Sequence, residues 1–269
     1  MKILFIGDIV GQKAVETLCE RLPSLRDRHG ADCVVANGEN MNLSGPVPHH
    51  GFGMTGSQVD ALFEAGVDVI TSGNHSWDGD EYSDVLMRER VLRPLNTPER
   101  WYGHGHASLV VDGTQLNVVN VSDESSIPES SSAHDALNAL SLAEGVILVD
   151  YHGDLVNRKL GFAFAVDGSV SAVVGTHTHE PTVLAHILPK GTGFVAEVGM
   201  TGPLGGVLGS SPDYFVAAEV GVEPAARPGS GLATGDIVLG AVLIEIGADG
   251  GTVDISRVGW SGLHEMAIH

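Results

Sequence analysis

Residues 1–8, MKILFIGD, contain a short apolar run, Leu4 to Ile6, that ends at Gly7 and Asp8. A run of this length is typical of a buried strand, and Asp8 places a carboxylate at its carboxyl end. The next apolar residues, from Val15 to Leu25, recur at helical spacing. They predict an amphipathic helix that Pro23 kinks or shortens.

The same order of strand, polar turn and helix recurs along the chain. A second apolar run, Cys33 to Ala36, ends in the turn 37–40 (NGEN), and a helix around 59–63 follows with Thr55 or Ser57 as its N-cap. A third run over 67–71 ends in the turn 72–75 (SGNH). Further strands are expected over 116–121, 146–149, 170–174, 194–198, 237–246 and 253–258.

This alternation predicts an α/β fold with antiparallel strands toward the C-terminal end. Two segments have the composition of surface loops: 123–135, which is rich in serine, and 223–235, which is rich in proline, glycine and alanine. Neither is long enough to require a domain boundary, and no internal repeat is found. We therefore expect a single domain over residues 1–269.

The overall charge excludes several classes of partner. The chain has 14 basic and 34 acidic residues, a net charge of −20, and 43% hydrophobic residues. This composition is globular, and it disfavours binding to duplex nucleic acid, which needs many basic side chains. Two cysteines exclude a disulfide scaffold. With neither a signal-peptide pattern nor a membrane-length apolar run, we expect a soluble, cytoplasmic protein with no membrane partner.

Possible metal ligands follow several of the predicted strands. Because ligands in open α/β sheets bind beyond the carboxyl ends of strands, we expect these side chains to meet. Imidazoles, carboxylates and amide oxygens suit Fe, Mn or Zn better than Ca or Mg alone. With His75 set aside, the candidates exceed what a single zinc needs. They are Asp8, Glu39, Asn40, Asn74, His152, His177 and His179.

A set of this size suits two divalent metals about 3.5–4 Å apart that share one carboxylate, a geometry used in phosphoryl chemistry. Glu39 is the best candidate for the shared carboxylate, because it is the only acid central to the set.

The motifs resemble those of the calcineurin-type metallophosphoesterases. The similarity is closer to the YmdB-like branch, and it extends from end to end of the chain. This resemblance implies a sandwich of mixed β-sheets flanked by helices. The segments that carry it are 7–11 (GDIVG), 37–40 (NGEN), 73–78 (GNHSWD), 175–179 (GTHTH) and 199–203 (GMTGP).

The resemblance also implies residue roles. Asp8, Glu39, Asn40 and His179 would hold the first metal, and Glu39, Asn74, His152 and His177 the second. His75 would lie beside the scissile phosphate as the catalytic residue and would not be a ligand.

The implied reaction is hydrolysis of small phosphodiesters, with 2′,3′-cyclic nucleotides as candidate substrates and two divalent ions, Fe or Mn before Zn, as cofactors. A hydroxide that bridges the metals would attack phosphorus while His75 protonates the leaving oxygen. The two cations bring about +4 into the crevice, which opposes the negative charge of the whole chain.

The sequence departs from the pattern in four places. One is 153–159 after His152, where only Asp154 and Lys159 are similar to the acidic run, with Thr and Ser, that the branch usually has. Val10 stands where the wider superfamily has a histidine ligand, and the YmdB-like branch uses Asn40 instead. Residues 41–50 resemble an insertion beside the site, and 122–135 replaces a segment that bears Arg and Phe in the branch. The metal ligands are therefore expected to be retained while the substrate walls differ.

Two other functions stay open. A metal-dependent amidohydrolase is disfavoured because its His-x-His motif usually lies on the first strand, whereas here His177 and His179 follow a late one. A metal-binding regulatory protein with little turnover fits the altered loops, although His75 argues against it. The sequence leaves open whether the chain forms a homo-oligomer.

Overall fold

The computed structural model describes residues 1–43, 52–223 and 231–259, and its centre is a pair of mixed β-sheets. The first sheet has the order β13 (Thr252–Gly259), β12 (Ala241–Ile246), β1 (Lys2–Ile6), β2 (Cys33–Asn37) and β3 (Val69–Thr71). The second has the order β4 (His106–Val111), β5 (Thr114–Ser122), β6 (Val146–His152), β7 (Ala172–Thr176), β9 (Gly193–Val195) and β8 (Ala185–Ile187).

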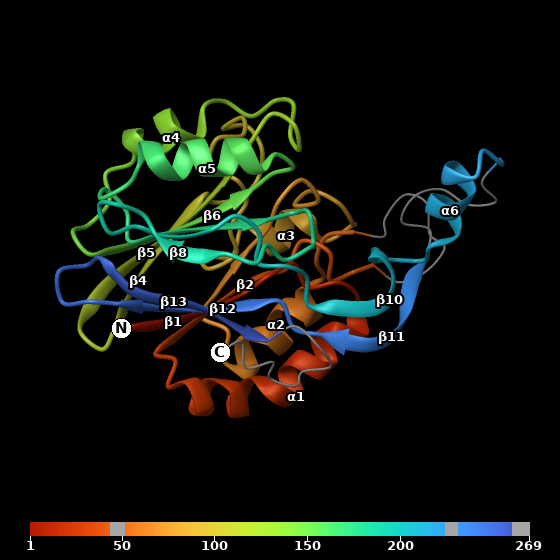
Figure 1. The fold of residues 1–269 in the computed structure, drawn as a ribbon, viewed down its shortest axis with the longest axis horizontal. Coiled ribbons are helices and arrows are strands. Elements are labelled where there is room, and N and C mark those ends of the chain that lie inside the picture. The colour runs from red at the N-terminus through yellow and green to blue at the C-terminus, as the bar shows by residue number, and fades with distance from the viewer. Residues whose placement is uncertain (44–51, 224–230, 260–269) are drawn as a thin grey trace.

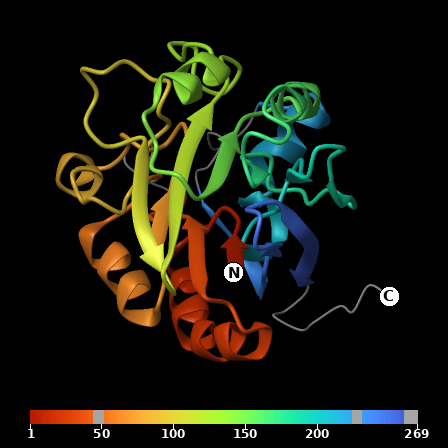
Figure 2. The same cartoon turned by 90° about the vertical axis from the view of Figure 1, so that its left-hand side faces the viewer.

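Helices cover the two outer faces of this sandwich (Figures 1 and 2). The helices α1 (Gln12–His29) and α2 (Gly56–Ala65) lie on the first sheet, and α4 (Ala133–Ala139) and α5 (Val156–Ala165) lie on the second. The short α3 (Tyr82–Leu86) follows β3. The predicted α/β sandwich of mixed sheets flanked by helices is confirmed.

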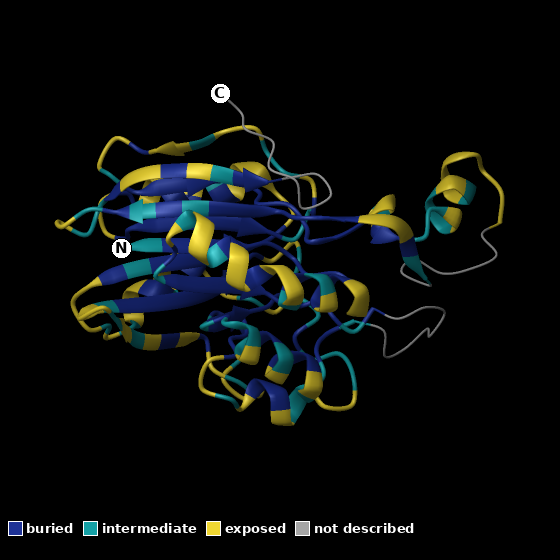
Figure 3. Cartoon of the chain, turned by 90° about the horizontal axis from the view of Figure 1, so that it is seen from below, coloured by how far each residue is buried: buried dark blue, intermediate teal, exposed yellow. Residues whose placement is uncertain are grey.

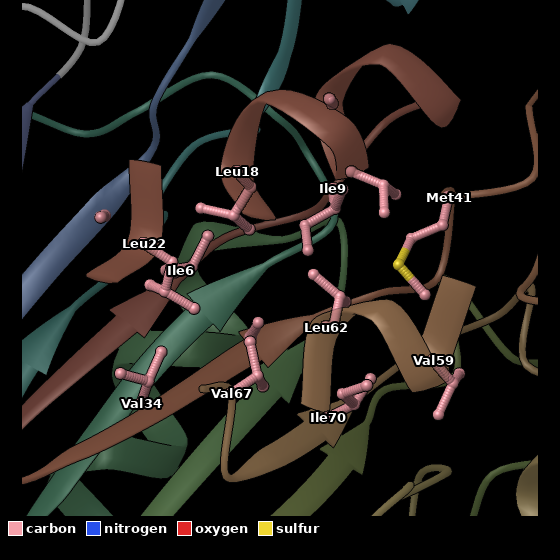
Figure 4. Packing of buried hydrophobic residues seen from close by; sticks show 14 of the residues in the cluster. Ile6, Ile9, Leu18, Leu22, Val34, Met41, Val59, Leu62, Val67 and Ile70 are labelled. Carbon is pink, nitrogen blue, oxygen red and sulfur yellow. The ribbon is translucent and has the colours of Figure 1, made fainter. Parts of the chain in front are cut away.

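Strand periodicity divides the core into layers. Ile3 and Phe5 of β1 pack between the sheets, while Leu4 and Ile6 belong to the cluster beneath α1 and α2. Successive side chains of a strand point to opposite faces, so one short run serves both layers. Figure 4 shows the helix-side layer, where Leu18 and other residues of α1 and α2 meet the sheet.

The parallel strands place their carboxyl ends at one edge of each sheet. β1 pairs parallel with β2, and β2 with β3, in the first sheet. In the second sheet, β5, β6, β7 and β9 are parallel in turn. Ser122, His152 and Thr176 are register partners at the ends of β5, β6 and β7. The polar turns that follow these strands therefore face a shared edge.

Pro23 does not shorten α1, contrary to the expectation from sequence. It lies inside the helix on the exposed side, and the helix continues to His29 and ends at Gly30 in the left-handed conformation. The buried side chains of Leu22 and Leu25 on either side keep the helix against the sheet. Tertiary packing outweighs the hydrogen bond that proline cannot donate.

A two-stranded ribbon projects from the sandwich (Figures 1 and 3). It consists of β10 (Gly202–Ser210) and β11 (Leu232–Val238), and α6 (Asp213–Glu219), which has no buried residue, lies beyond β10. The predicted single strand over 237–246 is therefore wrong: β11 ends at Val238 and pairs with β10, and β12 begins at Ala241 and pairs with β1.

Two predicted loops also differ from the structure. Residues 133–135 of the serine-rich segment begin α4, and residues 232–235 of the second loop belong to β11. Residues 224–230 and most of the expected insertion, 44–50, lie outside the described residues. Within the described part of the chain, no helix combines the length and apolarity needed to cross a membrane.

Candidate metal centre

The first candidate ligand, Asp8, follows β1 and is fully buried. Its Oδ2 accepts the backbone N–H of His177 at 3.2 Å, while its Oδ1 has no hydrogen-bond partner among the described residues. A buried carboxylate oxygen without a donor is costly, because the charged group has lost its water. An oxygen in this state is what a bound cation would satisfy.

Glu39 and Asn40 follow β2 in a turn that Asn37 stabilises. The backbone N–H of Glu39 donates to the side-chain oxygen of Asn37 at 3.1 Å, and the Asn37 amide donates to Asp150 at 3.0 Å. The Asn40 amide nitrogen lies 3.0 Å from Glu39 Oε1 and 3.2 Å from His179 Nε2. A half-turn of this amide would present its oxygen, the atom that a cation binds.

His152 is the last residue of β6 and lies at the centre of the cluster. Its Nε2 is 3.1 Å from Glu39 Oε2 and 2.9 Å from Asn74 Oδ1. Its Nδ1 is 3.0 Å from Thr176 Oγ1, and that hydroxyl donates to Asp150 at 2.7 Å. Because the hydroxyl proton is used on Asp150, the oxygen accepts from Nδ1, which leaves Nε2 for the cluster.

His177 and His179 follow β7 on strained backbone, with φ of 101° and 62°. His177 Nε2 donates to Asp154 Oδ1 at 2.9 Å, and its Nδ1 faces His152 Nε2 at 2.9 Å. His179 Nδ1 donates to the Leu208 carbonyl at 2.9 Å. Each imidazole of the cluster therefore has one nitrogen tied to an outer acceptor and the other directed inward, which is how histidine ligands are oriented around metals.

These residues form two groups that share Glu39. Glu39, His152 and His177 form one, and Asp8, Glu39 and His179 the other, with the ligand atoms of each group within 4.8 Å of one another. Asn74 and Asn40 complete the set through His152 and His179. The structure thus gathers every residue that the sequence nominated as a ligand, and the donor set fits two divalent cations.

The close approach of the backbone at Gly73 supports the same interpretation. A Cβ at this position would collide with His152 Nε2 and Glu39 Oε2. Only glycine allows the turn before Asn74 to pass this close to the carboxylate and imidazole.

Burial and neighbouring charges shift the pKa values of the groups in this cluster, and the direction differs from one group to the next. Burial, with a further contribution from Glu197, raises the pKa of Asp8 well above its ordinary value. Burial alone would also raise the pKa of Glu39, but His152 outweighs it and the pKa falls below its ordinary range. Burial alone would lower the pKa of His152, yet Glu39 raises that pKa to about 9. A proton on His152 therefore balances Glu39 at neutral pH.

The two histidines after β7 stay neutral. Burial and the adjacent His152 lower the pKa of His177 to about 4, and burial lowers the pKa of His179 below its ordinary value. Neutral imidazoles are the form that binds a cation.

His75 lies at the rim of the cluster. Its backbone N–H is 3.4 Å from Glu39 Oε2, and its Nδ1 is 2.8 Å from Asp78 Oδ2. The imidazole stacks on the Phe52 ring with a centroid distance of 4.1 Å. The side chain is 27% exposed, so it can reach a molecule in the crevice.

Sequence reasoning missed the residues that support this cluster. Asp154 and Asp150 hold His177 and the hydroxyl behind His152, as described above, and Glu197 lies beneath the turn that carries His177 and His179. A usable signal was present: Glu197 is a carboxylate inside the apolar segment 194–198 (FVAEV), where an acid needs a buried partner.

The sequence profile of the YmdB-like protein family matches residues 4–258. The chain belongs to this family. A curated relative, the 2′,3′-cyclic-nucleotide 2′-phosphodiesterase of Bacillus subtilis (strain 168), is 36% identical over 221 residues, which cover 80% of this chain and 81% of the relative.

Solved structures agree with the YmdB-like assignment. A protein from Thermus thermophilus superposes with a TM-score of 0.85 at 35% identity, covering 97% of this chain and 99% of that one. A phosphatase from Mycoplasma pneumoniae has a TM-score of 0.85 at 26% identity, covering 96% and 92%. A 5′-nucleotidase precursor, also from Thermus thermophilus, is 11% identical with a TM-score of 0.52, shares the fold and matches over 54% of its own length.

Proposed function

We propose that this chain is a phosphodiesterase that uses two divalent cations to hydrolyse small phosphodiesters, with 2′,3′-cyclic nucleotides as the substrate class. The observation that carries the proposal is the pair of ligand groups that share Glu39, with His75 beside them. The name of the Bacillus subtilis relative supports the substrate class.

The atoms that face the centre of the cluster favour one assignment of the candidate ligands to the two cations. Asp8 and His179 form one group with Glu39, and Asn40 contacts His179, so these residues would hold the first cation. His152 and His177 form the other group with Glu39, and Asn74 contacts His152, so these would hold the second. This mixed oxygen and nitrogen set favours Fe or Mn, with Zn as the alternative.

The bound cations would supply a water of lowered pKa and would take up charge on the phosphoryl oxygens. The chain's own residues then orient the substrate and move the proton. Asp78 holds Nδ1 of His75, which leaves Nε2 for the substrate. The imidazole would donate a proton from Nε2 to the oxygen that leaves phosphorus.

An assay on the purified full-length chain tests this function. The protein is incubated with Mn²⁺ or Fe²⁺ and offered bis-p-nitrophenyl phosphate, 2′,3′-cyclic AMP and a panel of amides. We expect cleavage of both diesters, loss of that activity in His75→Ala, and an unchanged metal content in this variant. His186→Ala, an exposed histidine of edge strand β8, is the matched control and should retain activity.

Other outcomes would identify the rival functions. Cleavage of amides alone would indicate an amidohydrolase. Binding of two metals with no turnover of any substrate would indicate a metal-binding regulatory protein. Full diesterase activity in His75→Ala would show that His75 does not take part in the reaction.

A further inference from the structure

An open hollow beside the His75 turn is lined by aromatic rings and has a volume of about 290 Å³. The chain is poor in such residues, with 5% aromatic content, three tryptophans and four tyrosines. Both tryptophans of the described residues and two of the four tyrosines nevertheless line this hollow. Its lining residues are Trp77, Tyr82, Arg100, Trp101 and Tyr102.

The rings are held in place before any ligand arrives. Trp77 Nε1 donates to the Tyr102 carbonyl at 3.2 Å, and Trp77 meets Trp101 edge-on at a centroid distance of 4.5 Å. Tyr82 and Tyr102 form a second edge-on pair at 5.9 Å. Trp77 and Tyr82 also pack on the core beneath α1 and α2. Their inner sides are thereby fixed.

The outer side of the hollow is open to solvent. Tyr102 is 53% exposed and Arg100 is exposed. A fixed aromatic surface that remains exposed is typical of a binding site, because it retains apolar area that binding would remove from water.

One wall of the hollow lies close to His75. Trp77 is two residues after His75, which places their Cα atoms within about 8 Å of each other. The segment that carries Trp101 is tied to the second sheet at the edge where the ligands gather, because the Asn96 amide donates to the carbonyl of Ser122 at 2.8 Å. Ser122 is the register partner of His152.

The chemistry of the lining indicates a ligand. The chain has a net charge of −20, yet the only charged side chain among the lining residues is Arg100. Aromatic faces with one guanidinium suit a planar base that carries a phosphate nearby, since rings stack on bases and arginine binds phosphate or stacks as well. A carboxylate-bearing or purely aliphatic ligand would gain less from these rings.

We propose that the hollow formed by Trp77, Tyr82, Arg100, Trp101 and Tyr102 is a stacking subsite for the nucleobase of a nucleotide whose phosphodiester lies at the metal centre. This inference rests on the proposed function and adds base recognition to it. The base belongs either to the cyclic mononucleotide itself or to the preceding nucleotide of an oligonucleotide that ends in a 2′,3′-cyclic phosphate.

Binding is tested without turnover. Tryptophan fluorescence of the full-length protein is titrated with adenosine 3′-monophosphate, and with ribose 5-phosphate as the base-free comparison. We expect saturable quenching with the nucleotide alone. Tyr102→Ala should weaken binding roughly 5- to 150-fold, the range given by stacking of one base. Tyr102→Phe, which keeps the ring, should bind as the unaltered chain does.

Two further variants test whether the fluorescence change comes from the hollow. Phe164→Ala removes an exposed ring on α5, outside the hollow, and should leave binding unchanged. Trp101→Phe should reduce the amplitude of quenching, since it removes a reporter from the hollow itself. Equal nucleotide affinity in Tyr102→Ala and the unaltered chain, or absence of quenching, would overturn the proposal.

Kinetics distinguish the two sources of the base. In Tyr102→Ala, a raised KM for 2′,3′-cyclic AMP with unchanged kcat identifies the base of the mononucleotide. A raised KM confined to adenylyl-adenosine 2′,3′-cyclic phosphate identifies the preceding base, and no change with either substrate overturns the subsite. If no diester is cleaved at all, the proposed function fails, while the fluorescence titration still decides whether a base binds.

Discussion

The buried ion pair of Lys159 and Glu197 gives the sharpest stability prediction. Lys159, on α5, is 0% exposed, and Glu197 is 1% exposed. The ammonium donates to Glu197 Oε2 at 2.9 Å and to the carbonyl of Thr176 at 2.7 Å. The carboxylate also accepts from the backbone N–H and hydroxyl of Thr178, at 3.0 and 2.8 Å, and from the N–H of Gly199 at 3.2 Å.

Replacing Lys159 by methionine would leave the Glu197 charge buried without its partner. Breaking such a pair costs about 3–5 kcal/mol, because the carboxylate keeps its charge in a buried place after its hydrogen-bonded partner is lost. At about 2–4 °C per kcal/mol for a chain of this size class, the midpoint of thermal unfolding should fall by about 6–20 °C. Thr178 separates two candidate ligands, His177 and His179, so metal affinity should fall as well.

The assay is thermal and urea unfolding followed by circular dichroism, together with metal titration of the folded protein. Arg158→Met is the matched control, since Arg158 neighbours Lys159 on α5 and forms an exposed ion pair with Glu124. Pairs of this kind contribute about 0–1 kcal/mol. In Lys159→Met combined with Glu197→Gln, part of the lost stability should return because no lone charge remains. A loss in Lys159→Met no larger than in Arg158→Met would refute the reasoning.

Three further predictions concern the metal centre. Glu39→Ala should lose both metals, measured as metal per chain by mass spectrometry, and retention of two would contradict a shared ligand. Asp78→Asn should lower kcat and leave the metal content unchanged, and the loss should not exceed the factor of about 10²–10⁴ that general acid catalysis supplies. An unaltered rate would show that Asp78 does not support His75 in catalysis. The raised pKa of His152, about 9, keeps this residue protonated at pH 7. Metal binding should therefore release a proton at pH 7, and this release should disappear above pH 9. Calorimetry in buffers of different ionisation enthalpy measures this release, and equal values at both pH values would contradict it.

Local patterns in the sequence predicted many of the strands and nominated the candidate ligands that follow them. A short apolar run that stops at a polar turn is visible without knowledge of the fold, and parallel pairing then brings such turns to one edge. This is why Asp8, Glu39 and His152 could be nominated from sequence although they lie far apart in the chain.

The supporting residues could not be predicted in the same way. Lys159 and Glu197 are 38 residues apart and meet only when α5 packs on the second sheet. The ribbon of β10 and β11 was missed because β10 is rich in glycine and lacks an apolar pattern. The aromatic hollow was missed because Trp77 and Trp101 meet through tertiary packing. Local patterns carry no information about such long-range contacts.

The backbone of His177 and His179 has a consequence for engineering. Positive φ values at residues other than glycine cost about 1–3 kcal/mol each, and here they occur at two histidines that belong to the two ligand groups. Glycine at either position would relieve that cost while it removed a ligand. Selection for heat resistance alone would therefore be expected to replace the histidines at these positions. Thermostable variants need to be screened for retained metal as well as for melting temperature.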